Sequence, residues 1–227
     1  RDVKSQGKGL VFAMPHLFRE DGARRFGTFY EGLARVCDGA LIRNWESRQW
    51  LLDQGFEKKI YSDANLYGWN QRSRSFLAEN GIWRATAPVE LNRRELARLG
   101  MEGTYLIIYG YLPVMLTANC IQKSGTGCSR AEGLLFLEDR QKKKFPVKNC
   151  CRYCYNIIYN CAPLDLISLA DEVESLDPAG LRIDLTLETK EEAERILKRC
   201  YRTFVLGEKD LPPEGEYTRG HFKRGVK

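Results

Sequence analysis

Histidine is scarce in this chain, and several familiar catalytic motifs are missing. There are two histidines, His16 and His221, so we expect no zinc hydrolase site built from several imidazole ligands. Neither a Gly-x-Ser-x-Gly nor a His-Glu-x-x-His motif occurs, which removes the usual sequence signs of a serine hydrolase or a zinc protease. No Gly-x-Gly-x-x-Gly or phosphate-loop motif follows an expected strand, which disfavours a nucleotide-binding fold.

Long apolar runs are missing too. The longest covers residues 106–118, is interrupted by Gly110 and Pro113, and is too short to span a bilayer. We therefore expect no membrane span. The chain starts at Arg1 rather than at a methionine, so we expect its true N-terminus to lie upstream, and the lack of a signal peptide carries no information.

The chain does contain enough apolar sequence for a folded core. Its 227 residues are 43% hydrophobic and 29% charged, which suits one domain or one and a half. Four tryptophans and 11 tyrosines argue against disorder. The formal net charge of +6 is a mild excess, which permits nucleic-acid binding without requiring it.

Cysteine is unevenly distributed. Six of the eight cysteines lie between Cys120 and Cys161, whereas a secreted disulfide scaffold is normally shorter and denser in cysteine. Such clustering indicates metal ligation rather than cross-linking. Cys37 and Cys200 lie in or beside expected helices, and we interpret them as buried free thiols. This usage favours a reducing cytoplasm.

Two short-range pairs stand out within this cluster. Cys120 and Cys128 have seven residues between them, and Cys151 and Cys154 form a Cys-x-x-Cys. Four thiolates that arrive as two such pairs can close a tetrahedral sulfur cage, which suits an iron–sulfur cluster of four irons and four sulfides or, alternatively, zinc. Free core thiols or disulfides are the other interpretation. Cys150 is the alternative to Cys151 as a ligand. Cys151 gives the tight two-residue spacing to Cys154, whereas Cys150 would give a looser loop.

Short apolar runs alternate with amphipathic stretches through the first half of the chain. The expected strands are 9–14, 39–43, 59–62, 82–87 and 104–109, and the expected helices are 24–36, 45–54, 71–78 and 92–99. Later we expect a hairpin at 135–147, a helical stretch at 166–175, a strand at 181–187 and a helix at 191–204. Asn92 and Thr189 are expected helix caps.

Repeated βα units with apolar strands predict a parallel sheet covered by helices. About five units are visible, whereas a barrel needs eight. We therefore predict an α/β fold, a partial (βα)8 TIM-like barrel whose first units lie upstream. An open doubly wound sheet is the alternative.

Three segments follow from this prediction. Residues 1–119 form the βα units, residues 120–165 a cysteine-rich insertion with a β-hairpin, and residues 166–227 the final α/β units and a polar tail along the surface. A partial barrel has exposed sheet edges, so we expect the missing N-terminal part of the same protein or a homo-oligomer partner to cover them.

Polar residues follow the expected strands, at the ends where (βα)8 proteins carry their active sites. Arg43 suits a substrate carboxylate or phosphate, and Asp63 or Glu90 suits a general base. The candidate substrate-binding residues are Asn44, Asn65 and Asn70. For each Asn or Asp the alternative is a helix cap or a turn.

A set of ordered motifs resembles one protein family. They are TAPVELN at 86–92, YGYLPVM at 109–115, Cys120, Cys128, Asp139, Arg140, FPV at 145–147, CRYCYNIIYN at 151–160, Pro163, Leu164 and YTRGHFKRGV at 217–226. Together they resemble the collagenase-like peptidases of unknown catalytic type, peptidase family thirty-two, over residues 9–226. The resemblance implies a (βα)8-like barrel, of which this chain is the C-terminal portion.

The family's name implies a peptidase, yet its members are similar to oxygen-independent hydroxylases that carry a four-cysteine iron–sulfur cluster. Those proteins act on RNA bases or the ubiquinone ring, with prephenate as the proposed oxygen donor. By this resemblance the cluster ligands are Cys120, Cys128, Cys151 and Cys154. Cys150 and Cys161 are then extra. The hydroxylase branches place their later cysteines differently from this chain, so their substrates do not transfer.

We therefore expect an iron–sulfur enzyme of the oxygen-independent hydroxylation type, acting on RNA or a small aromatic molecule. One alternative is a collagenase-like peptidase, whose cysteine nucleophile would need one of the two histidines nearby. Another is a zinc-stabilised RNA-binding module, which the mild basicity, the lysines at 142–144 and the many aromatics permit.

Overall fold

The computed structural model describes residues 2–125, 127–209 and 211–225. The described residues do not include Arg1 or Lys227. They also exclude Val226, which is the last residue of the closing motif at 217–226. The contacts divide the chain into two compact units. Unit 1 comprises residues 1–86, 116–135 and 148–157, and unit 2 comprises residues 87–115, 136–147 and 158–227.

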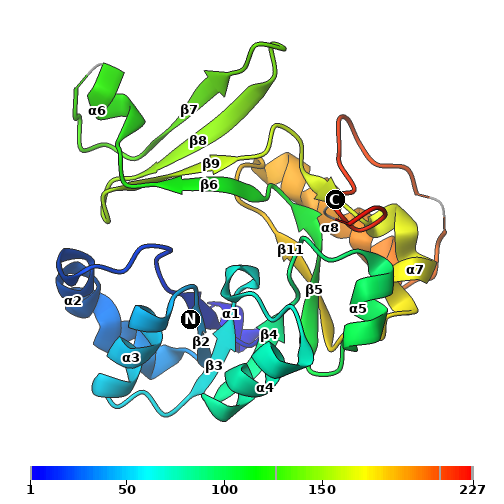
Figure 1. Cartoon of the computed structure of the whole chain (residues 1–227), viewed down its shortest axis with the longest axis horizontal. Coiled ribbons are helices and arrows are strands. Elements are labelled where there is room, and N and C mark those ends of the chain that lie inside the picture. Colours follow the sequence, from blue (N-terminus) through cyan, green and yellow to red (C-terminus); the bar gives the residue numbers. More distant parts are fainter. Residues whose placement is uncertain (1, 126, 210, 226–227) are drawn as a thin grey trace. The chain divides into compact units, whose positions relative to one another are not determined.

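Unit 1 contains four parallel strands, each followed by a helix or a turn of helix (Figure 1). The strands are β1 (Val11–Ala13), β2 (Gly39–Ile42), β3 (Lys59–Ser62) and β4 (Ile82–Thr86), in that order across the sheet. The helices are α1 (Asp2–Ser5), α2 (Glu20–Val36), α3 (Trp45–Asp53), η1 (Ala64–Leu66) and α4 (Gln71–Glu79). In the register, Val11 pairs with Gly39, and Gly39 pairs with Lys59. The predicted repetition of strand and helix is confirmed for this unit.

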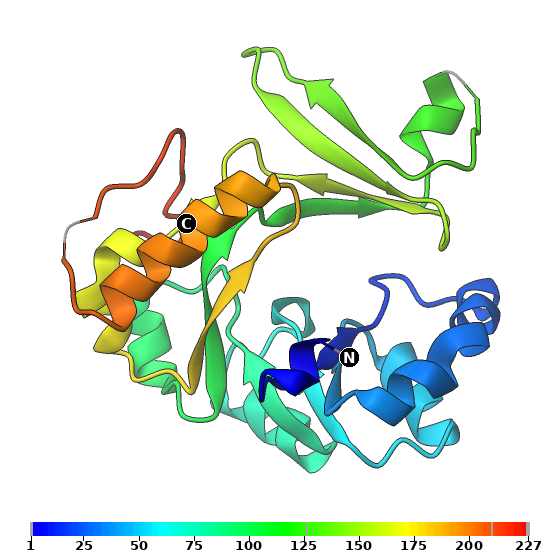
Figure 2. The ribbon, with the colours of Figure 1, turned by 180° about the vertical axis from the view of Figure 1, so that it is seen from behind.

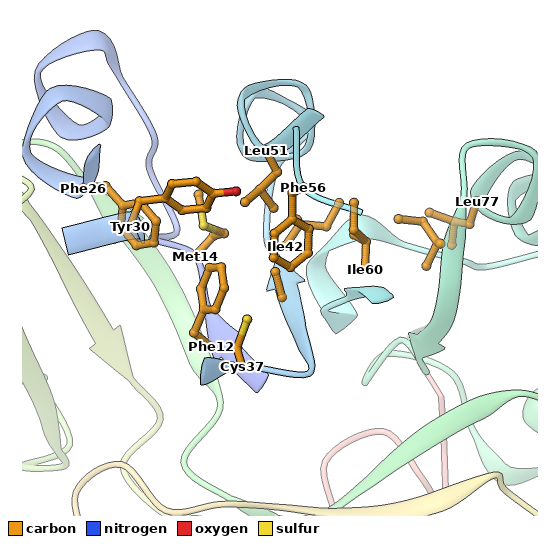
Figure 3. Packing of buried hydrophobic residues seen from close by; sticks show 12 residues of the cluster. Phe12, Met14, Phe26, Tyr30, Cys37, Ile42, Leu51, Phe56, Ile60 and Leu77 are labelled. Atoms are coloured by element: carbon orange, nitrogen blue, oxygen red, sulfur yellow. The ribbon is translucent and has the colours of Figure 1, made fainter. Parts of the chain in front are cut away.

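The core of unit 1 is rich in aromatic side chains (Figure 3). Phe26 and Tyr30, four residues apart on α2, are buried together with Phe12 of β1. The ring centroids of Phe12 and Phe26 are 5.9 Å apart, and Trp50 of α3 lies 4.9 Å from Tyr30. Each large apolar side chain removed from water stabilises the fold by roughly 1.5–3 kcal/mol, so this stripe fixes α2 and α3 to the strands.

Unit 2 is built around the long buried strand β5 (Thr104–Gly110). The short strand β10 (Leu164–Asp165) pairs antiparallel with β5, and β11 (Gly180–Asp184) pairs parallel with it. The helices are α5 (Arg93–Leu99), η2 (Ile167–Leu169), α7 (Ala170–Glu174) and α8 (Lys190–Phe204), the last drawn in orange in Figure 2. Asn92 and Thr189 cap α5 and α8 with reciprocal capping boxes, which confirms both predicted caps.

The C-terminal segment is part of unit 2 rather than a loose surface tail. Thr218 donates its N–H to the carbonyl of Pro163, and the N–H of Asp165 donates to the carbonyl of Thr218, both at 2.9 Å. Phe222 is buried, and its carbonyl accepts the N–H of Arg93 at 2.9 Å. The polar composition of this segment gave no sign in the sequence that Phe222 is buried.

A second sheet has four strands, and their residues are shared between the two units. Its order is β6 (Pro113–Thr117), β9 (Tyr155–Tyr159), β8 (Lys144–Cys150) and β7 (Gly133–Glu138), and helix α6 (Ile121–Gly125) follows β6. Strands β7 and β8 flank a turn in the segment where a hairpin is predicted. Asp139 closes that turn by accepting the N–H groups of Gln141 and Lys143 at 2.8 and 2.9 Å. Strands β6 and β9 were not predicted from the sequence.

The fold is therefore mixed α/β, with parallel strands and helices. The described residues do not contain eight strand–helix units, so a complete barrel is not present among them. The expected segment 120–165 is divided between the two units. No helix in the described part of the chain is both long and apolar enough to cross a membrane.

Candidate functional site

The cysteine pairs lie on two separate stretches of unit 1. Cys120 immediately precedes α6, and Cys128 follows that helix. Cys150 ends β8, and Cys151 and Cys154 lie in the turn that leads into β9. Strands β6 and β9 are neighbours, and the N–H of Asn160, just after β9, donates to the carbonyl of Leu112, just before β6, at 2.9 Å. The two strands therefore run in opposite directions, and the chain leaving β6 and the turn entering β9 belong to the same end of that sheet.

Two buried asparagines hold these stretches together. The side-chain oxygen of Asn156 accepts the N–H of Ile121 at 2.9 Å, and the amide of Asn149 donates to Gln122 Oε1 at 3.2 Å. The thiol of Cys151 also donates to the carbonyl oxygen of Ala131 at 3.1 Å. Residues adjacent to both cysteine pairs are thus connected by direct hydrogen bonds.

The pKa of the Cys151 thiol responds to the charges of the other three thiols. Its pKa is raised first by burial, and then by the charges of Cys120, Cys128, Glu132 and Cys154. Like charges gathered around one thiol disfavour its ionisation, and a bound cation would relieve that repulsion.

The turn that carries Cys151 and Cys154 is fixed to helix α2. The guanidinium of Arg25 donates to the carbonyl of Arg152 at 2.6 Å, and the Arg152 side chain lies 5.4 Å from the ring centroid of Phe29. Gly22 lies beside Tyr153, since a Cβ built there would be 3.5 Å from that ring, an ordinary van der Waals distance. Helix α2 therefore positions the second cysteine pair.

The donor set suits a metal centre, but its atoms are not yet arranged as ligands. Cys120 Sγ accepts the N–H of Lys123 at 3.4 Å, a kind of contact that stabilises a thiolate. Among the residues that the structure describes, no group of three Cys, His, Asp or Glu side chains could hold a metal ion in its present arrangement. Ligation would require the thiols to move closer together.

A second polar cluster lies at the carboxyl ends of β2 and β3. Arg43 Nε donates to Asp63 Oδ2 at 2.8 Å, and its Nη1 donates to the carbonyl of Met14 at 3.3 Å. The other oxygen of Asp63 accepts the N–H of Ala64 at 2.8 Å. Asn65 donates to the carbonyl of Arg43 at 2.7 Å. Three of the predicted site residues, Arg43, Asp63 and Asn65, are thus brought together.

Tyr155 connects this cluster to the cysteine-bearing turn. Its hydroxyl accepts the N–H of His16 at 3.2 Å and hydrogen-bonds with the Cys150 thiol. Burial first, and then the charge of Cys150, raise the pKa of Tyr155, and the His16 N–H and Arg43 offset this only in part. Burial likewise raises the pKa of Cys150, and Tyr155, Lys148 and Arg43 only partly offset it. Both groups therefore keep their protons at neutral pH.

The remaining predicted residues have mainly local roles. Asn44 caps α3 by accepting the N–H of Ser47 at 2.8 Å, and its amide donates to the carbonyls of Pro15 and His16 at 3.0 Å. Asn70 caps α4. Glu90 belongs to unit 2, where one of its carboxylate oxygens is buried without a hydrogen-bond partner among the described residues.

Sequence reasoning missed Tyr155, Asn149 and Asn156. The two asparagines flank the Cys-x-x-Cys on either side, in NCCRYCYN, and that symmetry was the available signal. Tyr155 had no signal of its own, because its partners His16 and Arg43 are more than a hundred residues away in the chain.

Comparisons with known proteins add no relatives. No model of a protein family matches the chain, and no curated protein and no solved structure matches it significantly.

Proposed function

We propose that this chain belongs to an iron–sulfur enzyme of the oxygen-independent hydroxylation type that resembles peptidase family thirty-two. The observation that supports it best is that direct hydrogen bonds connect the two stretches of chain that carry these cysteines. The charges of Cys120, Cys128 and Cys154 also contribute to raising the pKa of Cys151. A reducing cytoplasm, where thiols persist, suits such a site.

The ligands of the cluster would be Cys120, Cys128, Cys151 and Cys154. When bound, a four-iron four-sulfur cluster supplies one-electron redox chemistry. The N–H of Lys123 already points at Cys120 Sγ, and hydrogen bonds of this kind help to set a cluster's reduction potential.

The polar cluster at the strand ends would bind the substrate. The Arg43 side chain is 22% exposed, so its guanidinium can meet a carboxylate or phosphate while Asp63 and the Met14 carbonyl hold it in place. We therefore assign Asp63 to positioning Arg43 rather than to proton abstraction.

The peptidase alternative has less support. Cys150 is connected to His16 through Tyr155, but only by way of the His16 backbone N–H. A nucleophilic cysteine also needs a lowered pKa, and burial raises that of Cys150. The zinc-stabilised RNA-binding module uses the same four thiols, and metal analysis distinguishes it.

The deciding experiment is iron, zinc and acid-labile sulfide analysis, with a visible spectrum, on protein purified without oxygen. We expect about four irons and four sulfides per chain. The Cys151→Ser variant should lose most of the iron and the colour, because it removes one of the four proposed cluster ligands. Cys161→Ser is the matched control and should keep both.

Three results would overturn this proposal. One zinc per chain without colour would make the cage structural. Equal iron content in Cys151→Ser and in the unsubstituted protein would exclude Cys151 as a ligand. If Cys150→Ser then loses the iron, Cys150 is the ligand instead. Absence of any metal, with gelatin cleavage that Cys150→Ser abolishes, would favour the peptidase.

A further inference from the structure

The loop between β3 and α4 presents two aromatic rings to solvent. Tyr67 and Trp69 are 51% and 49% exposed, although rings of this size are usually buried. Their centroids are 5.7 Å apart, and their planes are nearly perpendicular, at 88°. The pair offers aromatic faces in two orientations.

This loop is held firmly at both ends. Asp63 caps η1 at its start, and Asn70 caps α4 at its end in a reciprocal capping box with Ser73. Between them Leu66 packs against the core of unit 1. Tyr67 has a φ of 53°, a left-handed conformation that is costly for a residue with a side chain.

The same loop is joined to the proposed substrate-binding cluster. Asn65 donates to the carbonyl of Arg43 at 2.7 Å, and Asp63 forms the ion pair with the Arg43 guanidinium at 2.8 Å. A molecule that contacts Tyr67 or Trp69 is therefore bound on the loop that also positions Arg43.

The charge of the segment selects an anionic ligand. Residues 64–78 contain no Asp or Glu, and their two charged residues are Arg72 and Arg74, in the first turns of α4. Acidic residues would be favoured at that position, because the N-terminus of a helix carries positive partial charge. The two arginines add to that charge instead, so the segment attracts anions.

Aromatic and basic side chains continue beyond the loop. Phe76 lies four residues after Arg72 on α4, hence on the same face, and is exposed. Its ring contacts that of Trp45 at 5.3 Å, and the Arg48 guanidinium lies 6.0 Å from the Trp45 centroid. Alternating aromatic rings and arginines are the chemistry that binds single-stranded nucleic acid.

We propose that the Tyr67–Trp69 loop and the start of α4 bind single-stranded nucleic acid, with bases stacked on Tyr67 and Trp69 and phosphates at Arg72. This inference deepens the proposed function, on which it rests for the choice of RNA over a small aromatic molecule as substrate. The absence of acidic residues from the segment favours a polyanion over a protein partner.

The test is fluorescence anisotropy with a labelled single-stranded RNA of mixed sequence, about 12 nucleotides long. We expect Trp69→Ala and Tyr67→Ala each to weaken binding about tenfold, the loss of one stacked base. Trp83→Ala is the matched control. Trp83 is 55% exposed and has a lysine ammonium 4.4 Å from its ring, but it lies near the amino end of β4, away from the strand ends that carry the site. Its substitution should leave the affinity unchanged.

Equal effects of Trp69→Ala and Trp83→Ala, or no RNA binding by the unsubstituted chain, would overturn the inference. The inference would also be overturned if Trp69→Ala abolished self-association without changing RNA binding. The surface would then bind a second copy of the chain. The two proposals can fail separately. If the protein contains no iron but still binds RNA through Trp69, the iron–sulfur proposal is wrong and the RNA-binding inference stands.

Discussion

Single side chains connect distant parts of unit 1, and Asp38 is an example. Its carboxylate accepts the N–H of Leu10 at 2.7 Å and pairs with the Lys4 ammonium at 2.7 Å. It thereby joins α1 and the chain before β1 to the start of β2. The Lys4 hydrogen bond first, and the Leu10 N–H second, lower the pKa of Asp38 below its ordinary value.

Asp38→Asn should therefore lower the melting temperature in a pH-dependent way. A carboxyl group whose pKa is lowered by folding stabilises the fold above its unfolded pKa, and that contribution is lost as the pH falls through the folded pKa. We expect a clear difference in melting temperature at about pH 7 that shrinks below about pH 4. High salt should reduce it, because the pair is exposed. A difference that is constant with pH would contradict this assignment.

At the scale of elements, the parallel strands of unit 1 depend on close backbone approach at Gly39. A Cβ at this position would lie 2.5 Å from the carbonyl oxygen of Lys59 and 2.8 Å from the Tyr61 ring. Gly32, on α2, differs in that nothing lies within 4 Å of a Cβ built there. The two glycines are in the same unit but have opposite surroundings.

Gly39→Ala should destabilise the chain by about 1–3 kcal/mol, because β2 and β3 would have to separate to accommodate the methyl group. Gly32→Ala should stabilise it by up to about 1 kcal/mol, because alanine loses less conformational entropy in a helix. Urea unfolding at constant pH measures both. Similar changes in the two variants would show that close strand packing does not limit this sheet.

At the scale of the whole molecule, each unit is assembled from three stretches of chain. The two cysteine-bearing stretches belong to unit 1, and the C-terminal segment is part of unit 2. In the latter, Arg219 donates to the carbonyl of Asp165 at 2.7 Å, and Phe222 is 4% exposed. Residues near the end of the sequence thus complete a unit that begins at Ala87.

Truncation after Gly215 should destabilise unit 2. It removes the backbone pairing of Thr218 with β10 and the buried Phe222 ring. Phe222→Ala alone should lower the free energy of unfolding by about 3–5 kcal/mol, the usual effect of deleting a buried aromatic ring. Limited proteolysis should cut the truncated chain faster within residues 87–115. An unchanged cleavage pattern would mean that this segment is dispensable.

Features with a local physical cause were predictable. The βα repetition of residues 9–99 and the caps Asn92 and Thr189 follow from hydrophobic periodicity and hydrogen bonding within a few residues. Asn44 and Asn70 show the limit of such reasoning. An asparagine after a strand has the same sequence signature whether it caps the next helix or binds a substrate, and both cap helices in the structure.

By itself, then, the sequence determined the strand and helix periods, the caps and the cysteine spacings, because these depend on neighbours along the chain. Only the tertiary structure decided that Arg43 pairs with Asp63, that Tyr155 lies between His16 and Cys150, and that Asn156 holds the chain next to Cys120. Apart from the contact of Tyr155 with Cys150, these contacts join residues about 20 to more than 100 positions apart. They form because buried polar groups require partners, and the order of residues along the chain does not specify which partner folding brings near.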